Sequence, residues 1–470
     1  MPGPAGRITI ICQFIGYFTD AFAIAKRFVC SEVVRTAART AAALGLLIVT
    51  VLWQIDRGGA PEGLAAAGRL AALWSTDLLL MQVFLMAHVP WVERGFGQDT
   101  LARWHRWTGF TSFVLLVAHV LLASVAATRR AGTDPFQLLW ALLVAYAGMV
   151  WAVAAFAALG LVVVTSLRVA RRRLRYESWH LLHLYAYLGI GLALPHELWL
   201  GSDFRAPAAR AYWCGLHLAA AGSMLVFRLG MPVWRTLRHR LTVDSVVTEA
   251  PGMVSVYFRG RRLDRLPVRA GQFFVWRFVD GWGALRGNPF SLSGPPSGDR
   301  LRITVKMVGD GSARVATLAS GTRALVEGPY GRMTAATYLG GRVTMLGCGV
   351  GVTPLLALLW DLPYGYGKAT LVYRTRHPDE VAFLDELEWL SQHRGVRLVP
   401  LVGPRAAPGS WLPAEFADYE DTAALLALSP DIAGQDVYVC GPDTWTAAVL
   451  RAARQAGVPA ARLHRERFGW

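Results

Sequence analysis

The sequence has 470 residues, of which 54% are hydrophobic and only 17% are charged. In soluble globular proteins about a quarter of the residues are charged. This composition therefore excludes a purely water-soluble protein as well as a disordered or fibrous chain. The formal net charge of +16 is almost wholly due to arginine, since the lysines are only Lys26, Lys306 and Lys368. These arginines cluster beside apolar segments, which is typical of a membrane protein and not of a nucleic-acid-binding surface.

Six long apolar stretches occupy the first half of the chain, and we predict an α-helical bundle of six transmembrane helices. Each stretch reaches or approaches the ~20 residues that a helix needs to cross a bilayer. Arginines follow the second, fourth and sixth stretches, so these loops are predicted to face the cytoplasm. We therefore expect a multi-pass protein of the cytoplasmic (plasma) membrane, surrounded by lipid. The stretches span residues 38–55, 70–92, 105–127, 137–169, 179–200 and 211–234.

The rest of the sequence divides at the ends of this bundle. Residues 1–37 are assigned to an N-terminal leader or interfacial segment, because the apolar run 8–25 lacks the basic n-region and the cleavage site of a signal peptide. The bundle occupies residues 38–240. A domain of short strands is expected over residues 241–338, and an α/β domain over residues 339–470.

The third and fifth predicted helices carry histidines, and ionisable residues at membrane depth are costly and are functional candidates. His105 and His119 are 14 positions apart, so they share one helix face about 21 Å apart along the axis. His183 and His196 are 13 positions apart. An ideal helix would place them on different faces, unless Pro195 changes the register.

These two helices run in the same direction, so their histidines are predicted to form two facing pairs, one at each leaflet. Imidazole is a normal axial ligand of haem iron, and two such ligands favour electron transfer over oxygen storage. His180 is the alternative to His183, whereas His88 and His217 are assigned structural roles. Asp77 is interpreted as an inter-helix hydrogen bond, with a proton or substrate role as the alternative. The five cysteines form no C-x-x-C motif, so no iron–sulfur cluster is expected.

After residue 240 the sequence changes to short alternating strands with turn signals, which predict a small antiparallel β-barrel. One strand segment has an aromatic ring followed by a hydroxyl, which suits stacking and hydrogen bonding to a flavin ring. A glycine-rich turn over residues 309–312 is expected to expose amides to a phosphate. The candidate FAD-binding residues are Asn288, Phe290, Ser291, Gly309, Gly311 and Ser312.

The last domain shows the order strand, glycine turn, helix and strand, which is typical of a nucleotide-binding α/β domain. Glycines allow a backbone to approach a pyrophosphate, and a helix N-terminus supplies N–H groups and a positive dipole end. The competing interpretation of such a glycine run is an ordinary turn. The candidate pyrophosphate-binding residues are Gly347, Gly349, Gly351, Thr353 and Pro354.

Two further motifs are expected at the same crevice. Arg374 and Arg376 follow the next strand, where arginine can accommodate the 2′-phosphate of NADP, so NADPH is the predicted dinucleotide. The alternative is a solvated basic turn. Cys440, Gly441 and Pro442 end a later strand, and Cys440 is either a packing residue or a neighbour of the nicotinamide.

Taken together, these motifs resemble the ferric reductase and NADPH oxidase family of transmembrane flavocytochromes b, joined to a ferredoxin-NADP reductase-like module. The resemblance covers about residues 38–470 and includes the Trp-His-Leu-Leu-His motif at 179–183 and the terminal Phe-Gly-Trp at 468–470. It implies that NADPH reduces FAD, which passes electrons singly through two b-type haems. The acceptor on the outer face would be oxygen, with superoxide formed, or ferric iron.

The resemblance also implies individual roles. His105 with His183 would hold the inner haem, and His119 with His196 the outer haem. A C-terminal aromatic ring would shield the flavin until nicotinamide displaces it. The residues implied at the reacting end of the flavin are Ser291, Cys440, Trp470 and Phe468.

One position departs from the family pattern. Asn288 stands where related proteins usually have histidine or arginine, so either FAD binds less tightly or Arg286 substitutes for the missing cation. Two other functions compete with an oxidase or ferric reductase. The chain would be an electron-transfer subunit that serves a partner protein, or a histidine-lined metal transporter with a nucleotide-binding domain. No nucleic-acid partner is expected.

Overall fold

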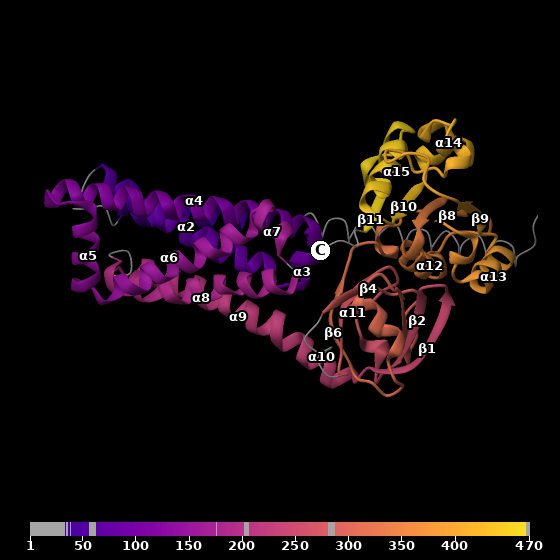
Figure 1. Cartoon of the computed structure of the whole chain (residues 1–470), viewed down its shortest axis with the longest axis horizontal. Coiled ribbons are helices and arrows are strands. Elements are labelled where there is room, and N and C mark those ends of the chain that lie inside the picture. Colours follow the sequence, from indigo (N-terminus) through magenta and orange to yellow (C-terminus); the bar gives the residue numbers. More distant parts are fainter. Residues whose placement is uncertain are drawn as a thin grey trace, which may run out of the picture. The chain divides into compact units, whose positions relative to one another are not determined.

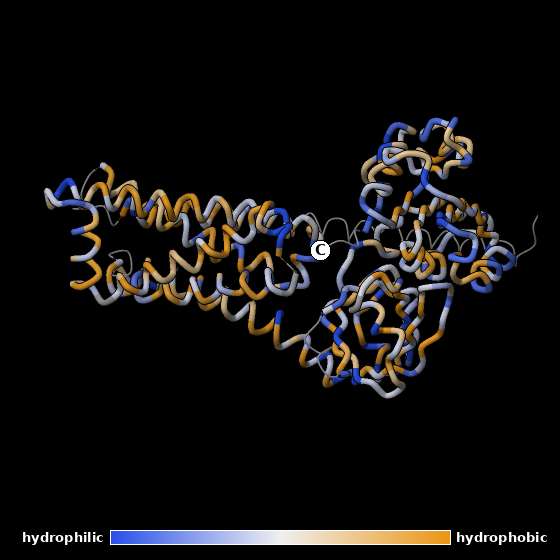
Figure 2. The backbone as a smooth tube through the Cα atoms, viewed as in Figure 1, coloured by the Kyte–Doolittle hydropathy of each residue, from blue (hydrophilic) through white to orange (hydrophobic). Residues whose placement is uncertain are grey.

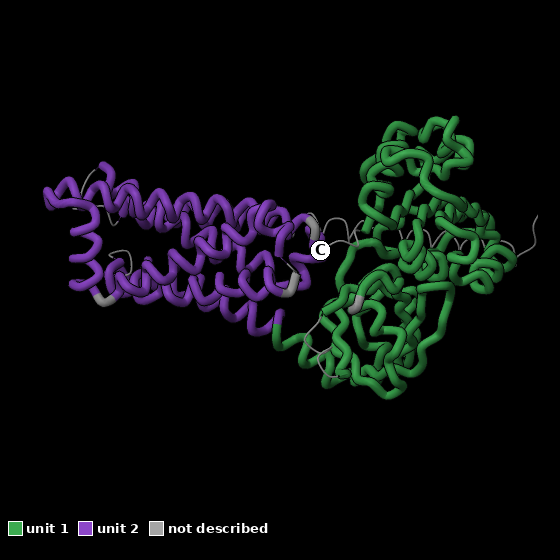
Figure 3. Tube along the Cα trace, in the orientation of Figure 1, with its two compact units in different colours: residues 1–27, 229–470 green, residues 28–228 purple. Residues whose placement is uncertain are grey.

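The computed structural model describes residues 33, 36–37, 39–55, 63–174, 176–201, 206–280 and 287–466. The chain divides into two compact units, one within residues 28–228 and one that includes residues 229–470 (Figure 3). The predicted interfacial run 8–25 lies outside the described residues.

The unit within residues 28–228, purple in Figure 3, consists of helices that carry mainly hydrophobic residues (Figures 1 and 2). In the described part of the chain, four helices are long and apolar enough to cross a membrane: Leu64–Met86, Thr100–Ala131, Gly148–Ser166 and Pro207–His239. The first and fifth predicted stretches are helical over Arg39–Ile55 and Tyr176–Leu200 but are not among these four. The helices of this unit are α2 (Leu64–Met86), α3 (Pro90–Phe96), α4 (Gln98–Ala131), α5 (Pro135–Ala145), α6 (Ala147–Ser166), α7 (Arg168–Arg173), α8 (Tyr176–Leu200) and α9 (Pro207–Ser223). The π-helix η2 (Met224–Gly230) and α10 (Met231–His239) continue from α9 into the other unit.

The prediction of one continuous helix over residues 137–169 is wrong. Helix α5 ends at Ala145, Tyr146 has an extended backbone, and α6 begins at Ala147. A straight helix of that length would be ~50 Å long, far more than the ~30 Å hydrocarbon core of a bilayer. The apolar run therefore has to bend or stop within this stretch.

Close helix packing pairs α2 with α4 and α6 with α8. At Gly68 in α2, an added Cβ would lie 3.2 Å from the side chain of Leu122 in α4. At Gly189 in α8, it would lie 2.9 Å from the side chain of Leu159 in α6. Small residues at such crossings let helix backbones approach closely in membrane bundles. The two histidine-bearing helices, α4 and α8, thus belong to different helix pairs.

Residues 241–338 contain two three-stranded antiparallel sheets, with the orders β1-β2-β5 and β4-β3-β6. Isolated antiparallel bridges join Thr242 to Arg323 and Leu292 to Ile303. Side chains from both sheets form one buried apolar core. Closure into a single barrel stays a prediction. The strands are β1 (Thr242–Ala250), β2 (Met253–Arg259), β3 (Phe273–Phe278), β4 (Asn288–Ser291), β5 (Arg300–Lys306) and β6 (Ala324–Tyr330).

The C-terminal domain is built on a five-stranded parallel sheet of order β11-β10-β7-β8-β9. One apolar cluster includes residues of α12 and α13, and another includes residues of α14 and α15, so both sheet faces are covered (Figure 1). This layout is the predicted α/β arrangement. The elements are β7 (Val343–Cys348), α12 (Val352–Asp361), β8 (Ala369–Thr375), α13 (Leu384–Arg394), β9 (Arg397–Val402), α14 (Asp421–Leu428), β10 (Asp436–Cys440), α15 (Asp443–Gln455) and β11 (Leu463–Glu466).

Candidate functional site

The parallel sheet reverses its strand order between β7 and β10. Strands β8 and β9 follow β7 on one side, and β10 and β11 lie on the other. In open α/β sheets, ligands bind at such a switch point, outside the carboxyl ends of the strands. The predicted glycine turn 347–354 follows β7, and the predicted segment 440–442 follows β10. Both therefore lie at the switch point.

The two turns pack against each other through glycines. An added Cβ at Gly351 would lie 2.2 Å from the carbonyl oxygen of Cys440, a distance that no real side chain tolerates. An added Cβ at Gly441 would lie 2.8 Å from the Cβ of Cys348. Gly349 has a φ of +55°, a backbone conformation that favours glycine. The chain thus requires glycine here to bring both strand ends together.

Backbone amides and cations lie around the strand end that these turns follow. Helix α12 begins at Val352, so its first amides and the positive end of its dipole face the turn. Burial raises the pKa of the Cys348 thiol, while the nearby cations Arg374, Lys306 and Arg405 oppose that rise. Amides and cations around one strand end fit an anionic pyrophosphate group.

The structure separates the two predicted 2′-phosphate ligands. Arg374 is buried, and its guanidinium donates to the carbonyl oxygens of Thr375 at 3.0 Å and Gly403 at 2.9 Å. Burial also lowers the pKa of Arg374. Arg376 is exposed after the end of β8, and its amide donates to Glu380. Arg374 therefore braces the turn, and Arg376 is the arginine whose side chain faces solvent.

Cys440 is fully buried at the end of β10, and its thiol lies 3.8 Å from the carbonyl oxygen of Glu466. Burial, with the neighbouring Glu466 carboxylate, raises the pKa of this thiol well above its ordinary value. Of the two predicted roles for Cys440, the burial favours packing.

We expect Cys440 to resist alkylation in the native protein. The thiolate is the reactive form, and a raised pKa keeps the thiol protonated at pH 8, below the ordinary thiol value of about 8.5. Mass spectrometry after iodoacetamide treatment should show no modification of Cys440 in the native protein. After unfolding in urea, Cys440 should be modified. Rapid modification of Cys440 in the native state would contradict its burial.

The predicted flavin-binding strand is β4, which pairs with β3 so that Ser291 lies opposite Phe273. Ser291 is buried, and Phe290 is partly buried against the apolar core. Asn288 begins the strand, and its side-chain oxygen would lie 3.5 Å from a Cβ added at Gly311. The strand and the glycine-rich turn are therefore neighbours.

In the segment 309–312, which is predicted to expose amides to a phosphate, some amides have partners within the protein. The Ser312 hydroxyl accepts hydrogen bonds from the amides of Val308 at 3.0 Å and Gly309 at 3.1 Å. The Ser312 amide donates to the Gly309 carbonyl oxygen. Serine hydroxyls commonly satisfy nearby backbone groups in this way. The amides of Gly309 and Ser312 thus already have partners within the turn.

The sequence does not reveal that the end of β11 lies close to β3, the strand that pairs with the candidate flavin-binding strand β4. An added Cβ at Gly331 would lie 3.2 Å from the Glu466 carboxylate and 3.3 Å from the Phe273 ring. Because Phe273 pairs with Ser291, Glu466 lies near the predicted flavin site. Only the pairing of β3 with β4 and β6 brings them together. Arg286, Phe468 and Trp470 lie outside the described residues.

In the helical unit, His105 of α4 and His183 of α8 face each other, with ring centroids 5.8 Å apart. Nδ1 of His105 lies 3.3 Å from the carbonyl oxygen of Gln82. Nδ1 of His183 lies 3.3 Å from the Ser166 hydroxyl. Each contact uses Nδ1, so Nε2 is the ring nitrogen that could bind another group.

The second predicted pair is His119 of α4 and His196 of α8. Nδ1 of His119 lies 2.9 Å from the carbonyl oxygen of Gly68. His196 lies within electrostatic range of His119, and its buried Nδ1 has no hydrogen-bond partner among the described residues. Helix α8 continues through Pro195.

These four histidines fit axial ligation of haem iron. Metal-ligating histidines typically hold their other ring nitrogen on a carbonyl or a similar partner, which fixes the tautomer and the ring orientation. Three of the four show this contact. Among the described residues, no group of three or more His, Cys, Asp or Glu side chains is arranged to hold a bare metal ion. The competing His180 forms a ring contact with Trp179 at 6.5 Å.

The other membrane-depth polar residues have protein partners. Nδ1 of His217 lies 2.9 Å from the carbonyl oxygen of Trp213, and its Nε2 lies 3.6 Å from Glu197. The Tyr212 hydroxyl donates to Asp77 at 2.8 Å, which is the inter-helix hydrogen bond expected for this aspartate. His88 pairs with Glu93 at 3.5 Å. These contacts agree with structural roles.

Comparison with known proteins finds a family and several relatives that match parts of this chain. Residues 71–194 match the family described as ferric reductase like transmembrane component. The ferredoxin reductase component of 3-ketosteroid-9-alpha-monooxygenase from Rhodococcus rhodochrous is 30% identical over 236 residues, which cover 48% of this chain and 64% of that protein. A flavohemoprotein from Chromobacterium violaceum is 29% identical over 256 residues, covering 51% and 62%. The chain has a ferric reductase-type transmembrane domain and a ferredoxin reductase-like C-terminal part.

The ferric reductase-like match includes His105, His119 and His183 and ends two residues before His196. The family resemblance drawn from the motifs is thereby confirmed. The chain spans less than two thirds of the length of these curated relatives. A solved ferredoxin NADP+ reductase from Neisseria gonorrhoeae with bound FAD and NADP covers 49% of this chain and 98% of its own, with 21% identity and a TM-score of 0.40.

Proposed function

We propose that this chain is a transmembrane oxidoreductase that passes electrons from NADPH through FAD and two b-type haems to an acceptor on the outer face. The acceptor is oxygen or ferric iron. In this proposal all six apolar stretches cross the membrane, and the antiparallel flavin domain and the nucleotide domain are cytoplasmic. The observation that carries it is the set of four histidines between two helix pairs, because three of them hold Nδ1 on a hydrogen-bond partner.

A flavin between nicotinamide and haem is a chemical requirement, since nicotinamide donates an electron pair as hydride and haem accepts one electron at a time. The chain's own residues bind and orient these groups. The α12 N-terminus and the glycine turn would hold the dinucleotide at the switch point. Phe290 and Ser291 on β4 would contact the flavin ring, and the neighbouring Asn288 and Gly311 would bind its phosphates.

A second candidate function is an electron-transfer subunit that serves a partner protein. The relatives favour it, because several are named as reductase components or subunits of multi-component monooxygenases. In this case the haem domain would deliver electrons to a docked partner, with little turnover of oxygen or ferric chelate alone.

The test is an anaerobic visible spectrum of the detergent-purified protein reconstituted with FAD, before and after addition of NADPH. A b-type haem spectrum that NADPH reduces is the expected result. Reoxidation by oxygen or by a ferric chelate then identifies the acceptor, whereas a stable reduced spectrum favours the partner-protein function. Protein that lacks haem despite an adequate haem supply would refute the haem proposal.

The choice of dinucleotide has its own test in Arg376. We expect Arg376→Ala to raise the KM for NADPH by ~10- to 100-fold, the effect of losing one charge-assisted phosphate contact, and to leave the KM for NADH unchanged. Steady-state reduction of an artificial acceptor measures both constants. Arg374→Ala serves as the comparison, because it removes the buried hydrogen bonds to Thr375 and Gly403 and should lower the thermal stability. Equal KM changes for both dinucleotides would exclude Arg376 as the 2′-phosphate ligand.

A further inference from the structure

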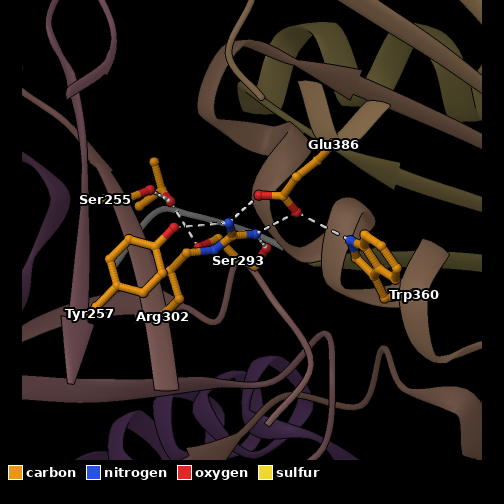
Figure 4. A network of polar contacts seen from close by, with 7 residues as sticks. Ser255, Tyr257, Ser293, Arg302, Trp360 and Glu386 are labelled. Carbon is orange, nitrogen blue, oxygen red and sulfur yellow. Dashed lines mark hydrogen bonds and ion pairs between the residues drawn. The ribbon is translucent and has the colours of Figure 1, made fainter. Parts of the chain in front are cut away.

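A partly buried ion pair connects the flavin domain to the nucleotide domain within the unit that includes residues 229–470. Arg302 on β5 contacts both carboxylate oxygens of Glu386 on α13, and its Nη2 lies 3.0 Å from Oε2 (Figure 4). The Arg302 side chain is only 10% exposed. Arginine and carboxylate joined by two parallel contacts make a directional pair, because both groups are planar.

On the flavin side, Arg302 holds the chain just after the candidate flavin-binding strand. Its Nη2 donates to the carbonyl oxygen of Ser293 at 2.6 Å, and the Ser293 amide donates back to the Arg302 carbonyl oxygen at 2.9 Å. The Ser293 hydroxyl also accepts from Thr304 at 2.8 Å, and Thr304 contacts Ser255 at 2.7 Å. Ser293 lies two residues after Ser291, so Arg302 acts on the end of β4.

On the nucleotide side, Glu386 is held by a second helix. The Trp360 indole donates from Nε1 to Oε2 of Glu386 at 3.2 Å, as Figure 4 shows. Trp360 lies on α12, whose N-terminus forms part of the candidate pyrophosphate site. The Arg302 guanidinium also lies 5.1 Å from the ring centroid of Phe383, beside the start of α13. One guanidinium thus joins β4 to the two helices that follow the glycine turn.

We propose that Arg302 is a positioning residue that holds the flavin-binding strand and the nucleotide-binding helix in one relative position, so that the nicotinamide meets the flavin in a reactive geometry. This inference rests on the proposed function. Ion pairs that are largely withdrawn from water contribute little net stability compared with apolar replacements, whereas a bidentate arginine–carboxylate pair fixes the relative orientation of its two groups. Arg302 therefore acts mainly on alignment, and hydride transfer is the step that depends on alignment.

The test compares Arg302→Met, Arg302→Lys and Glu386→Gln in the full-length, FAD-reconstituted protein. All three are expected to slow flavin reduction by NADPH by ~10-fold or more, because small misplacements strongly reduce transfer rates. The bound FAD per protein should stay unchanged. Lysine keeps the charge without the planar fork, so Arg302→Lys should not restore the rate. The matched control is Arg259→Met, which removes an ion pair to Asp244 inside the flavin domain and should leave the rate unchanged.

A second readout does not depend on activity. Amide hydrogen exchange should become faster in α13 of Arg302→Met and stay unchanged in α15, which has no part in this network. Faster exchange in both helices, or faster exchange in α13 with a wild-type rate of flavin reduction, would overturn the positioning role. If NADPH does not reduce the flavin of the wild-type protein, the proposed function is wrong. Hydrogen exchange in α13 would still show whether Arg302 joins the two domains.

Discussion

Replacing His119 with alanine is expected to halve the haem content of the purified protein. Nδ1 of His119 is held by the Gly68 carbonyl oxygen, which leaves Nε2 as the ring nitrogen for iron. Under the proposed function, loss of one of two axial ligands would remove the haem at that leaflet and leave the other pair, His105 with His183, intact. The haem-to-protein ratio, measured as the pyridine haemochrome, should fall about two-fold, by loss of one of the two haems.

The control for this variant is His217→Gln. His217 is a histidine of α9 whose two ring nitrogens face Trp213 and Glu197, so its loss should leave the haem content unchanged. Wild-type haem content in His119→Ala, or an equal loss in His217→Gln, would show that His119 is not an axial ligand. Because the flavin domain is not altered, reduction of the flavin by NADPH should proceed at the wild-type rate in both variants.

The second large effect is expected for Gly351→Ala. The added Cβ would lie 2.2 Å from the Cys440 carbonyl oxygen and 2.9 Å from the Gly441 amide nitrogen, and both are backbone atoms that cannot rotate away. The turns after β7 and β10 must then separate, which displaces the pyrophosphate-binding amides. We expect the rate of flavin reduction by NADPH to fall by ~100-fold, as for other displacements of about 1 Å near a reacting centre.

Stopped-flow absorbance of the flavin measures this rate, and dithionite provides the internal comparison. The haem spectrum after dithionite reduction should equal that of the wild type, because the helical unit is unchanged. Gly434→Ala is the matched control, since an added Cβ there meets nothing within 4 Å. Near-normal NADPH reduction in Gly351→Ala would mean that the two turns do not form the dinucleotide site.

Part of the candidate site follows from local sequence patterns. The histidine spacing in α4 follows from helix geometry, because residues 14 positions apart lie on nearly the same face. The glycine turn at 347–354 is recognisable because a strand and a helix flank it within a short segment. In both cases the candidate site depends on residues that are close together in the sequence, so their spacing and type are sufficient to recognise it.

Other features depend on contacts between distant segments. The local sequence does not distinguish Arg374 from Arg376 as a phosphate ligand. Only the packing of the turn against Gly403 buries Arg374 and leaves Arg376 exposed. The thiol of Cys440 is protected because β10 lies inside the sheet.

The sequence by itself determined the membrane half, the paired histidines of α4, the glycine turn and the order of the domains. Each of these follows from a local pattern in the sequence, such as the length of an apolar run, the period of a helix or the residues of a turn. Only the tertiary structure decided that Arg302 meets Glu386, 84 positions away, and that Glu466 lies beside Phe273. Such pairs form where strand order and helix packing bring remote segments together, and no local period encodes that order.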